Sequence, residues 1–395
     1  MNKTIRQIDY DIVVFSDDWN GLPFSCKHLL RHFLPDVRLI WVETIGLRSP
    51  KLNLYDINRA IKKITGWFSK TQGSQGSLPE NLYIIDPFQI PYNQVGIVRN
   101  FNKQMVIRTL KPFNPRYSNR ERVLITTWPF TGNIVGSLGE RLSIYYRVDD
   151  FSEFPWVRKD FIRRLENELI EKVDMVVASA ENLAQVGAEK TTKYLPHGAD
   201  FQHFASVVKE SNPPAPLKNI PGPRIGFFGL LNSWLDFDLL FQVAIEYPDW
   251  AFIFIGPSQL SPAVLPNAPN FHFLGPVPYD ELPAHACHFD VALIPFKINA
   301  LTISVNPLKL MEYFSLGLPV VSTPLPEVTK YKDSVFIASD PKTFGDAIEK
   351  ALLEDDEKAR VSRQEIAKSH SWLKKSLELK NWIEAALEKT IVDPN

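Results

Sequence analysis

The feature that most constrains the fold is an alternation of short apolar runs and helical patterns, which occurs twice along the chain. The runs in the first half are Asp11–Ser16, Arg38–Val42, Leu82–Ile85, Val123–Thr126, Ser143–Tyr146 and Met175–Ala178. Those in the second half are Arg224–Phe228, Ala251–Ile255, Phe271–Leu274, Val291–Ile294 and Val320–Ser322. Runs that are apolar at nearly every position indicate strands buried on both faces, as in parallel sheets. Right-handed crossovers between such strands predict a doubly wound α/β fold in each half.

A proline-rich stretch separates the two halves. Ser211–Pro223 contains five prolines and interrupts every periodic pattern, so it predicts an interdomain linker. A chain of 395 residues is long enough for two domains. We therefore expect an N-terminal domain over residues 1–205, a linker over 206–223 and a C-terminal domain over 224–370.

A last helix is expected within residues 371–395. Its pattern runs from about Ser371 to Lys389 and presents a broad apolar face that must pack in a groove. The apolar residues of this face are Trp372, Leu377, Leu379, Trp382, Ile383 and Leu387.

Composition and missing motifs exclude several classes of protein. The two cysteines, Cys26 and Cys287, have neither disulfide-framework nor zinc-site spacing, which fits a reducing cytosol. The N-terminus lacks a signal-peptide pattern, and no run of about 18 apolar residues could span a bilayer. We therefore expect a cytoplasmic protein. No Walker or GxGxxG loop occurs, which argues against an NTPase and a nicotinamide-dependent dehydrogenase.

Charge is distributed unevenly along the chain. Residues 1–122 hold 18 Lys and Arg against 10 Asp and Glu, although the whole chain has a net charge of −1. This local excess indicates either an anionic partner or a solvated basic face. Within it, Ile57–Lys70 places four apolar residues on one helical face beside several cations. That pattern predicts either peripheral contact with an anionic membrane, at the inner face of the plasma membrane, or an ordinary surface helix.

The most informative motif is Asn306–Val321, NPLKLMEYFSLGLPVV. It predicts a helix that begins near Pro307, ends at Gly317 and leads into a strand. Lys309 and Glu312 are three residues apart and so share one side of that helix. The free N–H groups of a helix start attract phosphate, to which Lys309 adds a cation. Glu312 is then placed to accept hydrogen bonds from a ribose. The alternative is a simple surface ion pair.

This segment resembles the donor-binding segment of GT-B glycosyltransferases grouped around family 4, the glycosyl transferases group 1. The resemblance implies two Rossmann-like domains that face a cleft, with a UDP-linked or GDP-linked sugar held by the C-terminal half. It assigns Asn306, Lys309 and Glu312 to the nucleotide, and gives Lys309 the catalytic task of stabilising the departing diphosphate. It also implies that the last helix returns to the N-terminal domain.

Further positions of this resemblance lie at predicted strand ends. RIGFFGL places Gly229 near the donor diphosphate, where a residue without Cβ lets the backbone approach. AFIFIGP places Gly256 near the nucleotide, and VALIPF ends in Phe296 beside the base or sugar. Gly21, in the loop DDWNG, is expected to approach the donor phosphates. The adjacent Asp17 and Asp18 do not make a metal site, and no metal or other cofactor is expected.

The stretch Tyr145–Ser152, YYRVDDFS, supplies a candidate catalytic base. Its YR-x-x-D pattern resembles the base-bearing segment of the xanthan-type glucuronosyltransferase, which makes Asp150 the candidate. The alternative is that Asp149 or Asp150 caps the following helix. His197, in LPHGAD, is interpreted as a structural hydrogen-bonding residue. Ser304 stands where many family-4 enzymes carry a further Glu, a departure that favours inversion of the anomeric centre over retention.

These features together predict a glycosyltransferase that moves a sugar from a nucleoside-diphosphate sugar to a saccharide or lipid-linked acceptor in cell-surface polysaccharide biosynthesis. Two alternatives stay open at this point. One is a nucleotide-sugar 2-epimerase on the same fold, and the other is a non-catalytic partner in polysaccharide assembly. Nucleic acid is not an expected partner.

Overall fold

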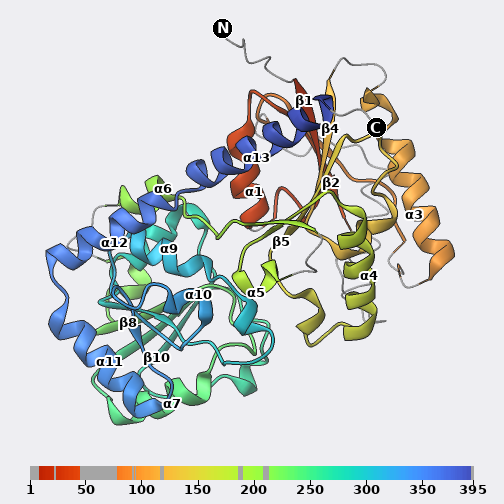
Figure 1. The fold of residues 1–395 in the computed structure, drawn as a ribbon. Helices are drawn as coiled ribbons and strands as arrows, with labels where there is room; N and C mark the ends of the chain where they lie inside the picture. Colours follow the sequence, from red (N-terminus) through yellow and green to blue (C-terminus); the bar gives the residue numbers. More distant parts are fainter. Residues whose placement is uncertain are drawn as a thin grey trace, which may run out of the picture.

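The computed structural model describes residues 9–21, 24–44, 78–90, 93, 95–115, 120–185, 190–207 and 213–392. The candidate membrane segment Ile57–Lys70 and part of the predicted linker lie outside these ranges. The described chain forms two α/β bodies, each built around one parallel sheet (Figure 1).

The N-terminal sheet has seven strands in the order β3-β2-β1-β4-β5-β6-β7. They are β1 (Tyr10–Ser16), β2 (Arg38–Glu43), β3 (Leu82–Ile85), β4 (Glu121–Thr126), β5 (Leu142–Arg147), β6 (Met175–Ala178) and β7 (Thr191–Tyr194). All of them pair in parallel, and every residue of β1 is buried. The order reverses beside β1, which makes this a doubly wound sheet.

Helices cover both faces of this sheet. The α-helices are α1 (Ser25–Leu30), α3 (Gly96–Thr109), α4 (Lys159–Lys172) and α5 (Glu181–Ala184). The next helix in the chain, α6 (Phe201–Ala205), belongs to the other body, because its Phe204 is buried in the C-terminal core. Short 3-10 helices are η1 (Arg31–Phe33), η2 (Lys111–Phe113), η4 (Pro129–Asn133) and η5 (Phe151–Glu153). Alternate residues of β1 point to opposite faces: Ile12 and Val14 pack in the cluster with α1, whereas Val13 and Phe15 pack with α3.

The C-terminal sheet has six parallel strands in the order β10-β9-β8-β11-β12-β13. They are β8 (Arg224–Phe228), β9 (Ala251–Ile255), β10 (Phe271–Gly275), β11 (Val291–Ile294), β12 (Val320–Ser322) and β13 (Phe336–Ile337). Around them lie η6 (Ala215–Leu217), α7 (Phe237–Glu246), η7 (Pro262–Val264), η8 (Tyr279–Glu281), α8 (Leu282–Ala286), η9 (Thr302–Ser304), α9 (Leu308–Ser315), α10 (Pro326–Thr329), α11 (Pro341–Glu354) and α12 (Glu357–Ser369). The linker residue Leu217 is itself buried in this core.

The last helix, α13 (Trp372–Val392), leaves the C-terminal body and packs against α1 and η1 of the N-terminal one (Figure 1). Trp372, Leu379, Ile383 and Leu387 are buried there with residues of the first sheet. Leu377 differs from the expected pattern, because it is 52% exposed and so lies off the buried face.

The predicted strands agree closely with the structure, and the predicted fold class, two Rossmann-like parallel-sheet domains, is confirmed. Two edge strands escaped prediction. β7 reads TTKY, which is not an apolar run, and none of its residues is fully buried; β13 has only two residues. An edge strand is paired on one side and packed less deeply, which weakens the sequence pattern that prediction depends on. None of the described helices is long and apolar enough to cross a bilayer.

Candidate functional site

Helix α9 holds Lys309 and Glu312, the two residues that the sequence assigned to the nucleotide, next to each other. Lys309 lies in its first turn, and its Nζ donates to Oε2 of Glu312 at 3.1 Å. Lys309 Nζ also lies 5.3 Å from the centroid of the Phe228 ring. Both side chains are largely buried, so the predicted pairing is present but is not an ordinary surface ion pair. In this arrangement a cation stands at a helix start, with a carboxylate one turn further along.

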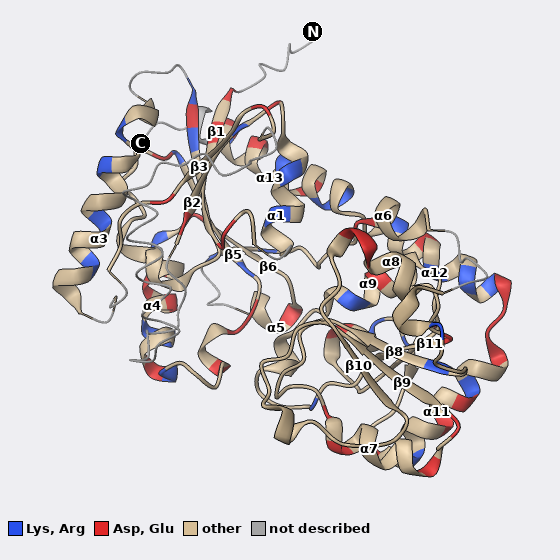
Figure 2. Cartoon of the chain, turned by 180° about the vertical axis from the view of Figure 1, so that it is seen from behind, with Lys and Arg blue, Asp and Glu red and all other residues tan. Residues whose placement is uncertain are grey.

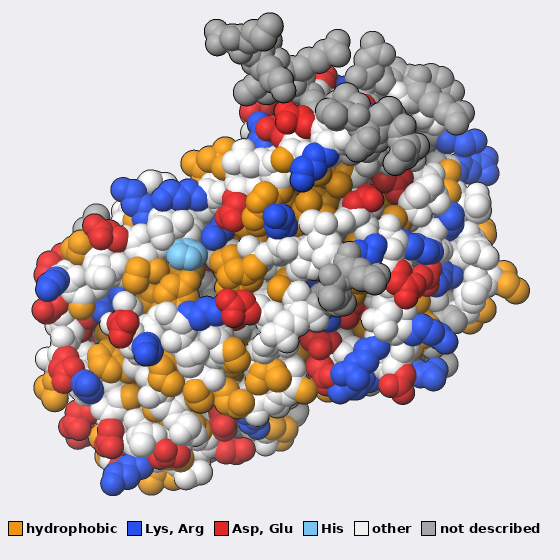
Figure 3. All heavy atoms as spheres, in the orientation of Figure 1, with side chains coloured by type: hydrophobic (Ala, Val, Ile, Leu, Met, Phe, Trp, Pro, Cys, Tyr) orange, Lys and Arg blue, Asp and Glu red, His pale blue; other side chains and the backbone are white. Residues whose placement is uncertain are grey.

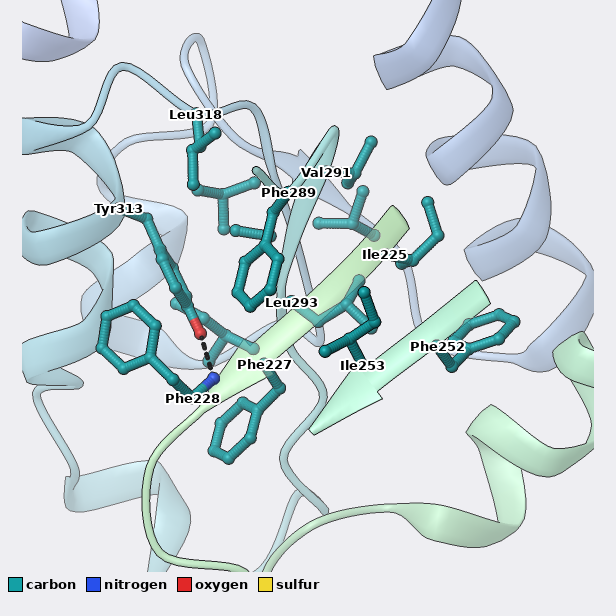
Figure 4. Packing of buried hydrophobic residues seen from close by; sticks show 14 of the residues in the cluster. Ile225, Phe227, Phe228, Phe252, Ile253, Phe289, Val291, Leu293, Tyr313 and Leu318 are labelled. Atoms are coloured by element: carbon teal, nitrogen blue, oxygen red, sulfur yellow. Dashed lines mark hydrogen bonds between the residues drawn. The ribbon is translucent and has the colours of Figure 1, made fainter. Parts of the chain in front are cut away.

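The turn after β8 brings backbone next to that cation. Gly229 has φ +145°, and a Cβ there would stand 3.0 Å from Cε of Lys309 and 3.2 Å from Cζ of Phe227. The base of the turn is tied to α9, because the Phe228 N–H donates to the Tyr313 hydroxyl at 3.1 Å (Figure 4). A side chain at position 229 would therefore clash where the strand end meets Lys309.

Gly256, the glycine after β9, packs directly against the backbone of this turn. A Cβ on Gly256 would stand 2.0 Å from the carbonyl oxygen of Gly229, and its φ is +143°. Its N–H donates to the carbonyl of Gly275 at 2.8 Å. The structure thus gives Gly256 a clear packing role, which is to let two loop backbones approach each other.

A pocket of about 240 Å³ opens between the two domains beside Lys309. Asp149, Phe154 and His197 line it from the N-terminal domain. The C-terminal domain supplies Phe227, Gly229, Leu230, Trp234, Phe296, Leu301, Thr302, Val305, Asn306, Pro307, Leu308 and Lys309. A mostly apolar cavity with a few convergent polar groups is the usual form of a small-molecule site. Gly21 is not among its lining residues; it is exposed, and its N–H donates to the carbonyl of Asp18 at 3.0 Å.

The two neighbouring aspartates after β5 have different surroundings. Oδ1 of Asp150 accepts from the Ser152 N–H at 3.1 Å and from the Ser152 hydroxyl at 2.6 Å, which caps η5. This is the capping arrangement left open in the sequence analysis. Asp149, in contrast, faces the pocket that contains Lys309.

Burial and neighbouring charge alter the acidity of the cleft carboxylates. Burial, with the charges of Asp150 and Asp17 added, raises the pKa of Asp149 to about 7. Burial, with the charge of Asp18 added, raises the pKa of Asp17 to about 6. Neighbouring carboxylates repel each other when both are ionised, so their pKa values rise towards neutral pH. A group that exchanges a proton during a reaction needs a pKa in this range.

Asn306 connects the pocket to the N-terminal domain. Its Nδ2 donates to the carbonyl of Ser179 at 2.9 Å, and its own carbonyl lies 3.0 Å from Nδ1 of His197. Because a carbonyl only accepts, Nδ1 of His197 carries the proton. Burial lowers the pKa of His197 to about 4, so this ring is neutral at pH 7. His197 therefore makes a structural hydrogen bond, and the Asn306 side chain is engaged across the domain boundary.

A buried carboxylate extends the same boundary. Glu327, at the start of α10, accepts from the Glu181 N–H at 2.7 Å, the Tyr194 hydroxyl at 2.6 Å and Lys330 Nζ at 2.8 Å. Nδ2 of Asn306 lies 3.4 Å from the same carboxylate. Sequence reasoning missed Glu327 because no local pattern marks a residue whose partners in the other domain, Glu181 and Tyr194, are more than a hundred positions away. It also missed Phe154 and Trp234, which line the pocket only because the fold brings the two domains together.

Comparison with known proteins agrees with this geometry. Residues 222–355, which contain β8 through α11, match the family described as glycosyl transferases group 1. This match covers about a third of the chain. It is also 29% identical over 241 residues to TuaH of Bacillus subtilis, a protein assigned as a teichuronic acid biosynthesis glycosyltransferase. That match covers 57% of this chain and 60% of the length of TuaH.

Solved structures show that this chain shares its fold with GT-B proteins. Sucrose-phosphate synthase from Thermosynechococcus elongatus superposes with a TM-score of 0.68 at 12% identity, covering 96% of this chain and 100% of that one. HepE of Anabaena, solved with UDP and glucose, superposes with a TM-score of 0.63 at 14% identity, covering 95% and 99%. At these identities the likeness concerns the fold, which is the GT-B arrangement of two facing domains.

Proposed function

We propose that this protein is a glycosyltransferase that moves a sugar from a UDP-linked or GDP-linked donor to a saccharide or lipid-linked acceptor during cell-surface polysaccharide biosynthesis. The observation that carries this proposal is that Lys309 and Asp149 line one pocket from opposite domains. A cation for the leaving group and a carboxylate for the attacking group are the two parts that such a transfer needs. The family of residues 222–355, the HepE structure in complex with UDP-glucose and the assigned role of TuaH support the class of reaction.

In the proposed reaction the donor diphosphate lies at the start of α9. Lys309 and the free N–H groups of the helix start stabilise the negative charge that grows on the diphosphate as the bond to the anomeric carbon breaks. Glu312 accepts hydrogen bonds from the ribose, and Gly229 leaves room for the phosphates to approach the backbone. Phe296 supplies an apolar wall for the base or sugar. Gly21 does not line this pocket, so any contact between Gly21 and the donor phosphates would have to lie outside it.

The acceptor is activated from the N-terminal domain. A carboxylate removes the proton from the acceptor hydroxyl as its oxygen bonds to the anomeric carbon. The motif resemblance favoured Asp150 for this task, whereas the pocket geometry favours Asp149, because Asp150 is held by Ser152. We assign the proton transfer to Asp149 and keep Asp150 as the residue that shapes the turn. Lys309 and the helix start, rather than a metal ion, are proposed to neutralise the diphosphate, so a chelator should leave turnover intact.

Donor binding can be tested with variants that keep volume but remove charge. Lys309→Met together with Glu312→Gln should weaken UDP or GDP binding by at least tenfold in isothermal titration calorimetry. Lys350→Met with Glu354→Gln, an exposed i,i+4 pair 3.6 Å apart on α11, is the matched control and should bind normally. Unchanged affinity in the first variant would remove the proposed site.

Turnover separates the proposal from its alternatives. Incubation with UDP-sugars or GDP-sugars and a bacterial lipid extract should release nucleoside diphosphate and label a glycolipid. Conversion of UDP-N-acetylglucosamine to its epimer without acceptor would instead identify a 2-epimerase. Nucleotide binding without release from any donor would indicate a non-catalytic assembly partner.

A further inference from the structure

The outer edge of the N-terminal domain exposes several large apolar side chains close together in the chain. Ile97 is 83% exposed, Val95 50%, Phe101 40% and Phe88 39%. Phe88 and Phe101 contact each other edge to face, with ring centroids 6.1 Å apart. Scattered exposed apolar residues are normal, but a contiguous group marks a binding surface.

Cations continue the same face along α3. Ile97, Phe101 and Arg108 follow one another at spacings of four and seven residues, so they lie in one stripe of the helix. Arg108 and, just beyond α3, Lys111 are exposed. Among the described residues neither has an acidic side chain within ion-pair distance. The 14 residues of α3 include no Asp or Glu. Its two other cations, Arg99 and Lys103, are half-buried, and Arg99 is paired with Glu168 at 2.7 Å.

The fold places this surface on the outer side of the N-terminal domain, with its apolar end at one edge of the sheet. β3 ends at Ile85, and the chain then passes Phe88 to reach the start of α3, so the apolar end of α3 lies at the carboxyl edge of the sheet. Figure 2 shows basic residues along the length of α3 at the periphery of the molecule, away from the C-terminal domain. Figure 3 shows hydrophobic side chains at this outer margin, as it does on other parts of the visible face.

We propose that these residues, which we call the α3 surface (Phe88, Val95, Ile97, Phe101, Arg108 and Lys111), bind an anionic lipid surface. Aromatic and aliphatic side chains at one end of a helix can enter the acyl boundary while cations along it contact acidic headgroups. A second copy of this chain fits less well, because self-association through the α3 surface would bring its cations together without acids to pair them. The assignment concerns described residues only and does not involve Ile57–Lys70.

The test measures binding of the full chain to vesicles. With vesicles of phosphatidylglycerol and phosphatidylcholine the wild type should co-sediment, and with phosphatidylcholine alone it should not. Ile97→Glu with Phe101→Glu should reduce the partition coefficient at least tenfold. Arg108→Gln with Lys111→Gln should reduce it roughly 25-fold, since each cation near such a surface accounts for about fivefold. Added salt should weaken wild-type binding.

Leu353→Glu is the matched control, because Leu353 is 79% exposed but lies on α11 of the other domain. This variant should bind vesicles as the wild type does. Equal loss in Leu353→Glu, no loss in the α3 variants, or salt-insensitive binding would overturn the proposal. A change in sedimentation coefficient of the α3 variants without lipid would overturn it in favour of a dimer interface. UDP binding by the same variants should be unchanged, so failure of this proposal is distinguishable from failure of the donor site.

Discussion

A Cβ at position 229 would lie 3.0 Å from Cε of Lys309, so the turn after β8 and the stem of the proposed phosphate-binding lysine occupy adjoining space. The sequence suggested glycine there because backbone must approach a phosphate. The structure adds a second reason, which is that Gly229 lets the turn close over Lys309 with φ +145°. Both reasons concern the space next to Cα of Gly229, where a side chain would meet Lys309.

Gly229→Ala should therefore damage donor binding more than it damages the fold. A non-glycine residue with this φ costs about 1–3 kcal/mol of strain, and the contact with Lys309 forces that side chain to move. We expect at least tenfold weaker UDP or GDP binding by calorimetry. Gly96→Ala, where a Cβ meets nothing within 4 Å, is the control and should bind nucleotide normally. Normal nucleotide binding by Gly229→Ala would show that the turn accommodates a Cβ without displacing Lys309.

Asp149 and Asp150 should differ sharply when each is changed to Asn. Asp149→Asn should lower kcat about 10²–10⁴-fold, the usual contribution of a positioned general base. Asp150→Asn keeps an oxygen that can accept from Ser152 and should lose little activity. Steady-state kinetics with a working acceptor decides between them. The opposite order of effects would return the base to Asp150, as the motif first indicated.

The pKa of about 7 for Asp149 predicts the pH dependence of the reaction. A base acts only when ionised, so log(kcat/KM) should rise with pH up to about 7 and level off above it. Asp149→Asn should abolish this limb while leaving weak, pH-independent turnover. A flat wild-type profile between pH 5 and 8 would contradict the assignment.

The same shift predicts how stability depends on pH. A carboxyl whose pKa rises from 3.8 unfolded to about 7 folded favours the folded state most fully below pH 4, and that contribution is lost as pH rises through 7. Asp149→Asn cannot ionise, so its melting temperature relative to wild type should increase between pH 4 and 8. Thermal unfolding at these two pH values is the measurement. Asp17 acts in the same direction, with its pKa raised to about 6.

Glu327 should be needed to hold the domains in register. Glu327→Ala leaves the Glu181 N–H and the Tyr194 hydroxyl without their acceptor, which should cost about 1–3 kcal/mol of unfolding free energy. Glu357→Ala removes an exposed acid whose ion pair with Arg360 is 3.2 Å long, and should cost less than about 0.5 kcal/mol. Urea unfolding of both variants checks this. Equal costs would mean that the buried Glu327 contacts contribute no more than a surface pair.

Much of the fold and part of the site could be predicted because their signals are local. Buried strands such as Ala251–Ile255 and Val291–Ile294 match the structure residue for residue, since an apolar run bounded by turns has few other interpretations. The Lys309–Glu312 pair was predictable because helical spacing alone places residues i and i+3 on one side. The edge strand Thr191–Tyr194 was not predicted, because its polar residues carry no periodic signal.

What the sequence determined by itself was the set of strands, the doubly wound class and the cation and carboxylate at the start of α9, because each depends on residues within a few positions of one another. The tertiary structure alone decided which aspartate faces Lys309. Asp149 and Asp150 are adjacent in sequence, but the Ser152 contacts turn one away and domain packing aims the other into the pocket. It also decided the Glu327 contacts and the exposure of the α3 surface, because burial and partnership depend on which distant segments the fold brings together.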